Sequence, residues 1–287
     1  MSLLLMQNIV KKYPGVTALD NVNFELEKGE VHVLMGENGA GKSTLMKILA
    51  GAEDKNSGKI YLNNAEVTIK NPIDAQKLGI VMIYQELNLV QQLSVGENIF
   101  LGREPKRKSG LIDWQKLYSE SAKLLARLNS NIDPKKEVSF LSVAEQQIVE
   151  IAKALSYQAK IIIMDEPTAA ITNREVEELF KVIKWLKESG IGIVYISHRM
   201  EEIFVVGDRI TILRDGKYVD KECIKDINKD DIIRKMVGRE LDQEFPKQQF
   251  IKGEEVLRVE NLSRHGSVEN ANVSIYRGEL LGFGGLV

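Results

Sequence analysis

Lys42 and Ser43 close a glycine-rich stretch, residues 36–44 (GENGAGKST), whose residue types suit phosphate binding. The stretch matches the pattern G-x-x-x-x-G-K-[ST] and lies between an apolar run, 31–35, and a helix-like segment that stops at Gly51. Glycines let backbone N–H groups approach phosphate oxygens, and the following helix directs its positive end toward them. The lysine supplies a cation for the β- and γ-phosphates, and the serine hydroxyl can ligate Mg²⁺. We therefore expect a phosphate-binding loop here rather than an ordinary glycine-rich turn.

A pair of carboxylates follows a second apolar run. Residues 160–164 (KIIIM) predict a strand buried on both faces, and Asp165 and Glu166 follow at its carboxyl end, before Pro167. Ligands of open α/β sheets gather at the carboxyl ends of strands. There Asp165 would hold the hydration shell of Mg²⁺, and Glu166 would polarise an attacking water. The plainer interpretation is an ordinary acidic pair at a strand end, and the phosphate loop upstream favours the chemical one.

His198 directly follows a third apolar run, residues 190–197 (GIGIVYIS). A lone histidine is usually structural, but this one stands at the carboxyl end of a strand, as the acidic pair does. A neutral imidazole there would bond an oxygen of the γ-phosphate. The three groups together predict an α/β protein whose strands end at one phosphate site.

The composition places few other demands on function. Lys+Arg is 39 against Asp+Glu 41, a net charge of −2, which requires neither a nucleic acid nor an acidic membrane surface as partner. Cys223 is the single cysteine, so an internal disulfide is excluded, which fits a reducing interior. No apolar stretch approaches the ~18 residues that span a bilayer, and the amino-terminal apolar block is too short for a signal peptide. These features predict a cytosolic chain that reaches a membrane only through a partner.

The order of further motifs narrows the protein class. Gln85 follows another apolar run in VMIYQELNLV, the segment LSVAEQQIVEIAKAL occupies 141–155, and KKYPGVTALD occupies 11–20. With the phosphate loop, the Asp-Glu strand and the histidine, this order resembles the ATP-binding cassette (ABC) ATPases over residues 3 to about 240. The stretches MDEPTAAIT and GIVYISHRMEEIF look like the ATPases of bacterial monosaccharide importers of the ribose, galactose and xylose type. In that branch each polypeptide carries two cassettes in tandem.

The resemblance implies an α/β fold: a P-loop NTPase (RecA-like) core with a mixed β-sheet and an inserted α-helical subdomain. The first cassette would span 1–241, with the helical subdomain at about 87–158 and a helix at 113–129. Independently of the resemblance, LRDGKYV (213–219) predicts a hairpin on Asp-Gly, and KDDIIRKMVGRE (229–240) predicts a closing helix with Gly238 near its end.

The family's functional positions carry over residue by residue. Tyr13 would stack on adenine. Glu166, His198 and Gln85 would be catalytic, and Ser43, Gln85 and Asp165 would hold Mg²⁺. The ATP phosphates would be bound by Gly36, Glu37, Asn38, Gly39, Ala40, Gly41, Lys42, Ser43 and Thr44. A second ATP, bound to an opposing cassette that closes head to tail on this one, would meet Ser142, Val143, Ala144 and Glu145.

The chain departs from the usual family signature, LSGGQ, which here reads LSVAE at 141–145. The methyl group of Ala144 limits how closely the backbone approaches a phosphate. Ser142-x-x-Glu145 before an apolar helical pattern predicts a capping box, in which Glu145 reaches back to its own helix start. The competing interpretation is a carboxylate that weakens closure beside the opposing γ-phosphate. Thr172 stands where the family often has Asp, which we interpret as a feature of the sugar branch.

The last part of the chain repeats its beginning. VLRVENLS (256–263) parallels LLLMQNIV (3–10), and NANVSIYRGELLGFGG (270–285) parallels NVNFELEKGEVHVLMG (21–36). Residues 242–253 are polar and predict a linker, and 254–287 predict the truncated start of a second cassette, with Gly285 in the place of Gly36. We expect this tail either to pair with strands of the first domain or to be poorly ordered.

Together these observations predict an ATPase that energises import of a monosaccharide. ATP and Mg²⁺ would be its cofactors. Its partners would be membrane permease subunits, an extracellular or periplasmic sugar-binding protein and a second cassette, with no nucleic acid. It would act peripherally at the cytoplasmic face of the cell membrane. A nucleoside importer, a non-transport ABC ATPase and a nucleotide-binding module without turnover remain as alternatives, and the sequence does not specify the sugar.

Overall fold

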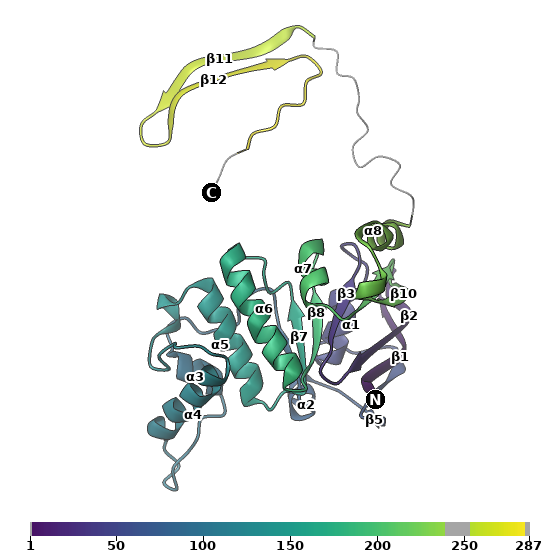
Figure 1. The fold of residues 1–287 in the computed structure, drawn as a ribbon, viewed down its shortest axis with the longest axis vertical. Helices are drawn as coiled ribbons and strands as arrows, with labels where there is room; N and C mark the ends of the chain where they lie inside the picture. The colour runs from purple at the N-terminus through teal and green to yellow at the C-terminus, as the bar shows by residue number, and fades with distance from the viewer. Residues whose placement is uncertain (1, 239–252, 285–287) are drawn as a thin grey trace. The chain divides into compact units, whose positions relative to one another are not determined.

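The computed structural model describes residues 2–238 and 253–284. The chain divides into two compact units, residues 1–240 and 241–287 (Figure 1). The predicted linker, apart from Gly253, and the end of the repeat, including Gly285, lie outside the described residues.

The centre of the first unit is a six-stranded sheet in the order β10-β9-β3-β8-β7-β6. Five neighbouring strands are parallel, and β10 pairs antiparallel with β9 across Asp215 and Gly216, which have φ of 51° and 72°. The strands are β3 (Val31–Met35), β6 (Ile80–Ile83), β7 (Ile161–Asp165), β8 (Gly192–Ile196), β9 (Arg209–Arg214) and β10 (Lys217–Cys223). The mixed sheet and the Asp-Gly hairpin are therefore confirmed.

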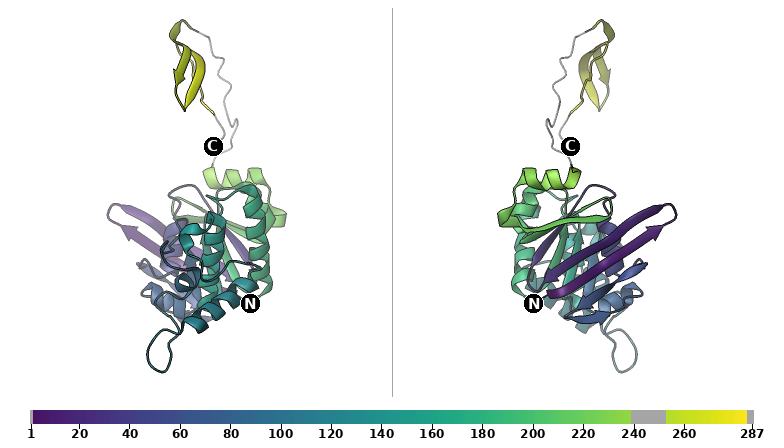
Figure 2. Two further views of the ribbon diagram at one scale, coloured as in Figure 1. Left: turned by 90° about the vertical axis from the view of Figure 1, so that its left-hand side faces the viewer. Right: turned by 90° about the vertical axis from the view of Figure 1, so that its right-hand side faces the viewer.

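A second, antiparallel sheet covers one face of this core through the helix α1 (Lys42–Leu49). Its order is β2-β1-β4-β5, with β1 (Ser2–Tyr13), β2 (Val16–Glu27), β4 (Ser57–Leu62) and β5 (Ala65–Val67). Figure 2 shows the long β1–β2 hairpin along one side of the unit. Apolar residues of α1, of this hairpin and of β7 share one hydrophobic cluster, so α1 and the loop before it are held between two sheets.

Helices cover the opposite face of the core sheet. α6 (Asn173–Glu188) packs there beside α7 (Met200–Val206), and the predicted helical insertion gathers at one side of the unit (Figure 1). The insertion contains α3 (Val95–Phe100), α4 (Trp114–Arg127), η1 (Val138–Phe140) and α5 (Val143–Ser156). The remaining helices are α2 (Pro72–Lys77), η2 (Ile224–Asp226) and α8 (Lys229–Val237), which ends at Gly238 with φ of 78°, as expected.

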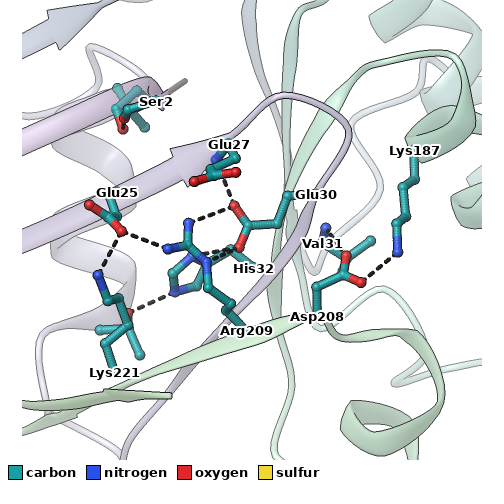
Figure 3. Close-up of polar contacts among 12 residues, drawn as sticks. Ser2, Glu25, Glu27, Glu30, Val31, His32, Lys187, Asp208, Arg209 and Lys221 are labelled. Atoms are coloured by element: carbon teal, nitrogen blue, oxygen red, sulfur yellow. Dashed lines mark hydrogen bonds and ion pairs between the residues drawn. The ribbon is translucent and has the colours of Figure 1, made fainter. Parts of the chain in front are cut away.

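Ion pairs join the two sheets where β2 and β9 approach each other (Figure 3). The Arg209 guanidinium donates to both oxygens of Glu30, at 2.5 and 2.9 Å, and to Glu25 at 2.6 Å. Lys221 of β10 donates to the same Glu25 oxygen at 2.6 Å. His32 is fully buried beside them, with Nε2 2.7 Å from the Thr211 hydroxyl. One guanidinium therefore links β9 to the β2 side of the antiparallel sheet.

The second unit contains a two-stranded antiparallel hairpin, β11 (Glu255–Arg264) and β12 (Val268–Tyr276). Its register reproduces that of β1–β2 at the aligned residues: Leu257 faces Ile275 as Leu4 faces Leu26. Irregularities repeat as well, because the Asn261 N–H donates to Asn272 at 2.8 Å as the Asn8 N–H donates to Asn23 at 2.9 Å. The sequence repeat is thus also a repeat of local structure. The expectation for the tail is wrong in one respect, since β11 and β12 pair with each other in a sheet of their own.

Candidate functional site

The phosphate loop joins β3 to α1 and depends on left-handed glycines. Gly39 and Gly41 have φ of 86° and 97°, a region that side-chain-bearing residues rarely adopt. A Cβ on Gly41 would lie 2.7 Å from the carbonyl oxygen of Ala18 and from a methyl group of Leu19, because the β2 side of the antiparallel sheet presses against the loop. Gly41 is also the N-cap residue of α1 and offers no side chain to cap it. The first-turn N–H groups of α1 thus form an anion-binding helix start.

Lys42 extends back over this loop. Its ammonium donates to the carbonyl oxygens of Gly36 at 2.7 Å and Glu37 at 3.0 Å. Burial lowers the pKa of Lys42, while the nearby charges of Glu166 and Asp165 oppose that shift. The structure therefore brings the lysine of the loop and the acidic pair of β7 within electrostatic reach of each other.

The acidic pair lies where β7 ends. Burial raises the pKa of Asp165, the adjacent Glu166 charge raises it further, and Lys42 opposes both effects. Glu166 has a φ of 47°, and its N–H donates to the Ile196 carbonyl of β8 at 2.9 Å. A left-handed backbone is uncommon for glutamate and turns the chain sharply after the strand. Asp165 lines the cleft that also contains Ser43 and Gln85, whereas Glu166 contacts Gln85 and His198.

Glu166 is the point where the predicted catalytic residues meet. The Gln85 side-chain N–H donates to Glu166 Oε2 at 3.0 Å, and His198 Nδ1 lies 3.1 Å from Glu166 Oε1. Since a carboxylate accepts, Nδ1 carries the proton in this contact. A neutral His198 then has Nε2 as an acceptor, so donating to a phosphate oxygen through Nε2 requires the imidazolium. The expectation of a neutral imidazole at the γ-phosphate stays a prediction.

Ser43, Gln85 and Asp165 line one cleft of about 610 Å³. The set supplies one carboxylate and two neutral oxygen groups, which fits a Mg²⁺ ion that takes its remaining ligands from phosphates and water. The cleft continues between Glu86 and Asn88 and helix α5, where Glu150 is buried and burial raises the pKa of its carboxyl. The Asn88 N–H donates to Glu150 at 3.0 Å, and Lys153 donates to the Asn88 carbonyl at 3.2 Å.

Tyr13 stands at the end of β1 and is 39% exposed. The Lys11 ammonium lies 4.9 Å from the centre of the Tyr13 ring and 3.0 Å from Glu53, whose pKa Lys11 and, more weakly, Tyr13 lower. Lys11 thus lies over the ring and is itself held by Glu53, which favours one orientation of the ring.

Ser142 and Glu145 form the predicted capping box at the start of α5. The Ser142 N–H donates to Glu145 at 2.8 Å, and the Glu145 N–H donates to the Ser142 hydroxyl at 3.2 Å. The capping interpretation is confirmed. Val143 is 41% exposed at this helix start, and Thr172 forms an equivalent box with Glu175 at α6.

The structure does not bring this segment to the phosphate loop. Ser142, Ala144 and Glu145 line a separate cleft of about 490 Å³ that shares no lining residue with the Ser43–Asp165 cleft. Within the described unit, the predicted site residues therefore form two groups.

The sequence analysis did not identify the buried residues that contact the segment carrying His198. Glu202 of α7 is buried and accepts hydrogen bonds from Tyr195 and Ser197, next to His198. No clear signal was available in the sequence, because HRMEEIF contains two adjacent glutamates and indicates neither which of them is buried nor its partners.

The parallel core, the glycine loop and the acidic strand end define a P-loop nucleotide-binding cassette with a helical subdomain. A family model described as ABC transporter matches residues 19–169, more than half of the chain. The chain therefore belongs to the ABC transporter family, and the predicted family and fold class are confirmed.

Two relatives and one solved structure show which members of this family the chain resembles. The chain is 51% identical over 285 residues to the putative ribose/galactose/methyl galactoside import ATP-binding protein 2 of Agrobacterium fabrum, covering 99% of this chain and 56% of that protein. It is 49% identical to the ribose import ATP-binding protein RbsA of Geobacillus kaustophilus, covering 98% and 57%. The ADP conformation of an ATP-binding cassette of an ABC transporter aligns with a TM-score of 0.73 at 27% identity, covering 83% of this chain and 100% of that one.

The chain thus spans about half the length of the curated relatives that it matches. Among the residues that the structure describes, we find no helix with the length and apolar character needed to cross a membrane.

Proposed function

We propose that this chain is an ATP-hydrolysing subunit that energises import of a monosaccharide of the ribose, galactose or xylose class. The observation that carries the proposal is the contact of Gln85 and His198 with Glu166 beside the phosphate loop. The names of the relatives, which concern import of ribose and galactose, support the substrate class.

Each residue of the first group has a role in this reaction. Tyr13 would stack on adenine, and the loop residues Gly36–Thr44 would bind the phosphates. Bound Mg²⁺, held by Ser43, Gln85 and Asp165, would neutralise phosphate charge. Glu166 would accept a proton from the attacking water, since its Oε1 and Oε2 are oriented by hydrogen-bonding partners on both sides. His198 would bond a γ-phosphate oxygen.

The second group would serve another ATP. Ser142, Val143, Ala144 and Glu145 lie at the exposed start of α5, and all but Val143 line a different cleft from Ser43 and Asp165. We propose that they contact the ATP of an opposing cassette, with two cassettes arranged head to tail. The repeated hairpin supports a second cassette that begins at about residue 254, in the same polypeptide.

The remaining partners are a membrane permease and an extracellular or periplasmic sugar-binding protein. We place the permease contact at residues 86–93, because this segment borders the Ser43–Asp165 cleft and is held to α5 by Glu150 and Lys153. The chain would then work peripherally at the cytoplasmic face of the cell membrane.

The test is the rate of ATP hydrolysis as a function of protein concentration, with Glu166→Gln as the blank. We expect specific activity to rise with concentration, because each copy lends its Ser142 segment to the site of another. The Glu166→Gln variant should bind ATP and lose at least 100-fold in rate, as expected when a general base is removed. Clear turnover that is equal in both proteins would reject the role of Glu166, and the absence of ATP binding would reject the proposal.

A further inference from the structure

Glu202 is a buried carboxylate that the reaction described above does not use. It lies in α7 and is 5% exposed. Its Oε2 accepts hydrogen bonds from the Tyr195 hydroxyl at 2.8 Å and from the Ser197 hydroxyl at 2.9 Å, and its Oε1 lies 3.3 Å from the Arg199 guanidinium. All three partners belong to the strand end and turn that carry His198.

These contacts hold the residues on either side of His198. The Ser197 hydroxyl donates to Glu202 and accepts from the Arg199 N–H at 3.0 Å. The segment 197–199 is thereby fixed through Ser197 and through the Arg199 side chain. His198 itself has a side chain that is 70% exposed, so packing does little to fix its imidazole. Its position beside Glu166 depends instead on the anchored residues before and after it.

The same group of side chains reaches the other strand end of the site. Tyr195 is fully buried in β8, and Thr168, two residues after Glu166, is near enough to the Tyr195 hydroxyl to lower its pKa. Burial and the Glu202 charge raise the pKa of Tyr195, which keeps its hydroxyl protonated as a donor. Thr168, Tyr195, Ser197, Arg199 and Glu202, here called the Glu202 cluster, therefore connect the segment after β7 with the segment after β8.

We propose that Glu202 is a positioning residue, which places the imidazole of His198 against Glu166 through Ser197 and Arg199. Its catalytic consequence rests on the proposed function, because only ATP hydrolysis gives the His198–Glu166 contact a reaction to serve. The effect of Glu202 on the position of the His198 imidazole does not depend on ATP. The two can therefore be measured separately.

The first experiment observes His198 by NMR in the full chain with ¹⁵N-labelled histidine. The chain has three histidines, of which His32 is buried in the core and His265 lies in the other unit, so the His198 imidazole signal is separable. In the wild-type chain, Glu166→Gln should shift this signal because Nδ1 lies 3.1 Å from Oε1. In Glu202→Ala, the signal should move toward that of a free histidine and no longer respond to Glu166→Gln.

Two further variants provide the controls. Glu201→Ala removes an exposed acid from the same first turn of α7 and should leave the His198 signal unchanged. Glu202→Gln retains an amide oxygen that can accept from both hydroxyls, so it should restore part of the response and keeps the test usable if Glu202→Ala does not fold. A His198 signal in Glu202→Ala and Glu202→Gln that responds to Glu166→Gln as in wild type would overturn the proposal.

The second experiment measures ATP hydrolysis. We expect Glu202→Ala to lower kcat by about 10- to 100-fold while the dissociation constant for ATP changes less than about twofold, as when a remote change misplaces a reacting group. In a His198→Ala background, the same change should cost nothing more. An equal loss in both backgrounds would overturn the proposal. A wild-type chain that hydrolyses no more ATP than Glu166→Gln would instead count against the proposed function, and the NMR result would still decide the role of Glu202.

Discussion

Glu166 combines a carboxylate that Gln85 and His198 both contact with an unfavourable backbone. Its φ of 47° lies in the left-handed region, which costs a side-chain-bearing residue about 1–2 kcal/mol. The surrounding structure maintains this geometry through the hydrogen bond from its N–H to Ile196 and through the contacts of its carboxylate. Strain of this kind is tolerated where it orients a reacting group.

This strain predicts that Glu166→Gly is more stable than Glu166→Ala, the reverse of the usual order for glycine and alanine. Glu166→Ala and Glu166→Gly both remove the carboxylate contacts, but only glycine adopts this φ without penalty. Glycine also loses about 0.4–1 kcal/mol through the entropy of the unfolded chain. We therefore expect Glu166→Gly to be more stable than Glu166→Ala by about 0.5–1 kcal/mol in urea unfolding. Equal stability, or a more stable alanine variant, would show that the backbone is not strained there.

The sequence was sufficient to predict which side chains belong to the candidate site but not how they contact one another. Asp165, Glu166 and His198 were found because they end apolar strands, and parallel strands end at one edge of a sheet. The contact of Gln85 with Glu166 joins residues 81 positions apart, and the tautomer of His198 depends on that same carboxylate. The support of Tyr13 by Lys11 and Glu53 also requires the fold, because no local pattern brings these side chains together.

Strands and helices were predicted best where their signals are local. The buried runs at β3, β7 and β8 and the capping box of α5 are confirmed because strand burial and helix capping are encoded within a few residues. The joining of the two sheets could not be predicted. Glu30 and Arg209 are 179 residues apart. In the sequence, each of them alone indicates only a charged residue at the surface.

The Glu30–Arg209 pair predicts an acid-sensitive step in stability. Burial by itself raises the pKa of Glu30, but the hydrogen bonds from Arg209 and the His32 imidazole, with Nδ1 3.4 Å from Glu30, outweigh burial and lower it from 4.5 to about 2. Because the folded-state pKa is below the unfolded value, ionised Glu30 stabilises the fold fully above about pH 4.5. This stabilisation is lost as the pH falls from about 4.5 to about 2 and amounts to about 3 kcal/mol.

The measurement is urea unfolding between pH 2 and 6 for wild type and Glu30→Gln. The wild-type free energy of unfolding should fall more steeply with acid than that of Glu30→Gln within that window. Burial lowers the pKa of His32 from 6.5 and Glu30 opposes that shift, so Glu30→Gln alters His32 as well and the comparison reports on Glu30, His32 and Arg209 together. Glu66→Gln, which removes a carboxylate from an exposed pair with Lys59, should match wild type. Parallel curves for wild type and Glu30→Gln would contradict the prediction.

The two units place equivalent residues in opposite environments. Leu4, Ile9 and Leu19 of β1–β2 are fully buried against α1 and the core sheet. Their counterparts in the second unit, Leu257, Leu262 and Val268, are 49%, 55% and 39% exposed. Beyond β12, Leu280 and Phe283 are 96% and 83% exposed. The hairpin therefore has the inward face of a cassette sheet without a core packed on it, and such surfaces favour association.

This contrast predicts two separable kinds of self-association. Apolar contact through β11–β12 would need no nucleotide, whereas the proposed head-to-tail pairing of phosphate loops with Ser142 segments would need ATP. We expect the Glu166→Gln chain to associate in sedimentation velocity both with and without ATP and Mg²⁺. The same variant ending at residue 240 should lose the nucleotide-independent part, because that part belongs to the second unit, and keep the ATP-dependent part.

The shortened chain is also the control for the hydrolysis experiment. If activity rises with concentration because cassettes pair around ATP, removal of residues 241–287 leaves that rise intact, since the phosphate loop and the Ser142 segment both lie in the first unit. If the rise instead reflects chains held together by exposed hairpins, it disappears with them. Association without ATP that is as strong in the shortened chain as in the full one would refute the assignment to β11–β12 and place the contact on the first unit.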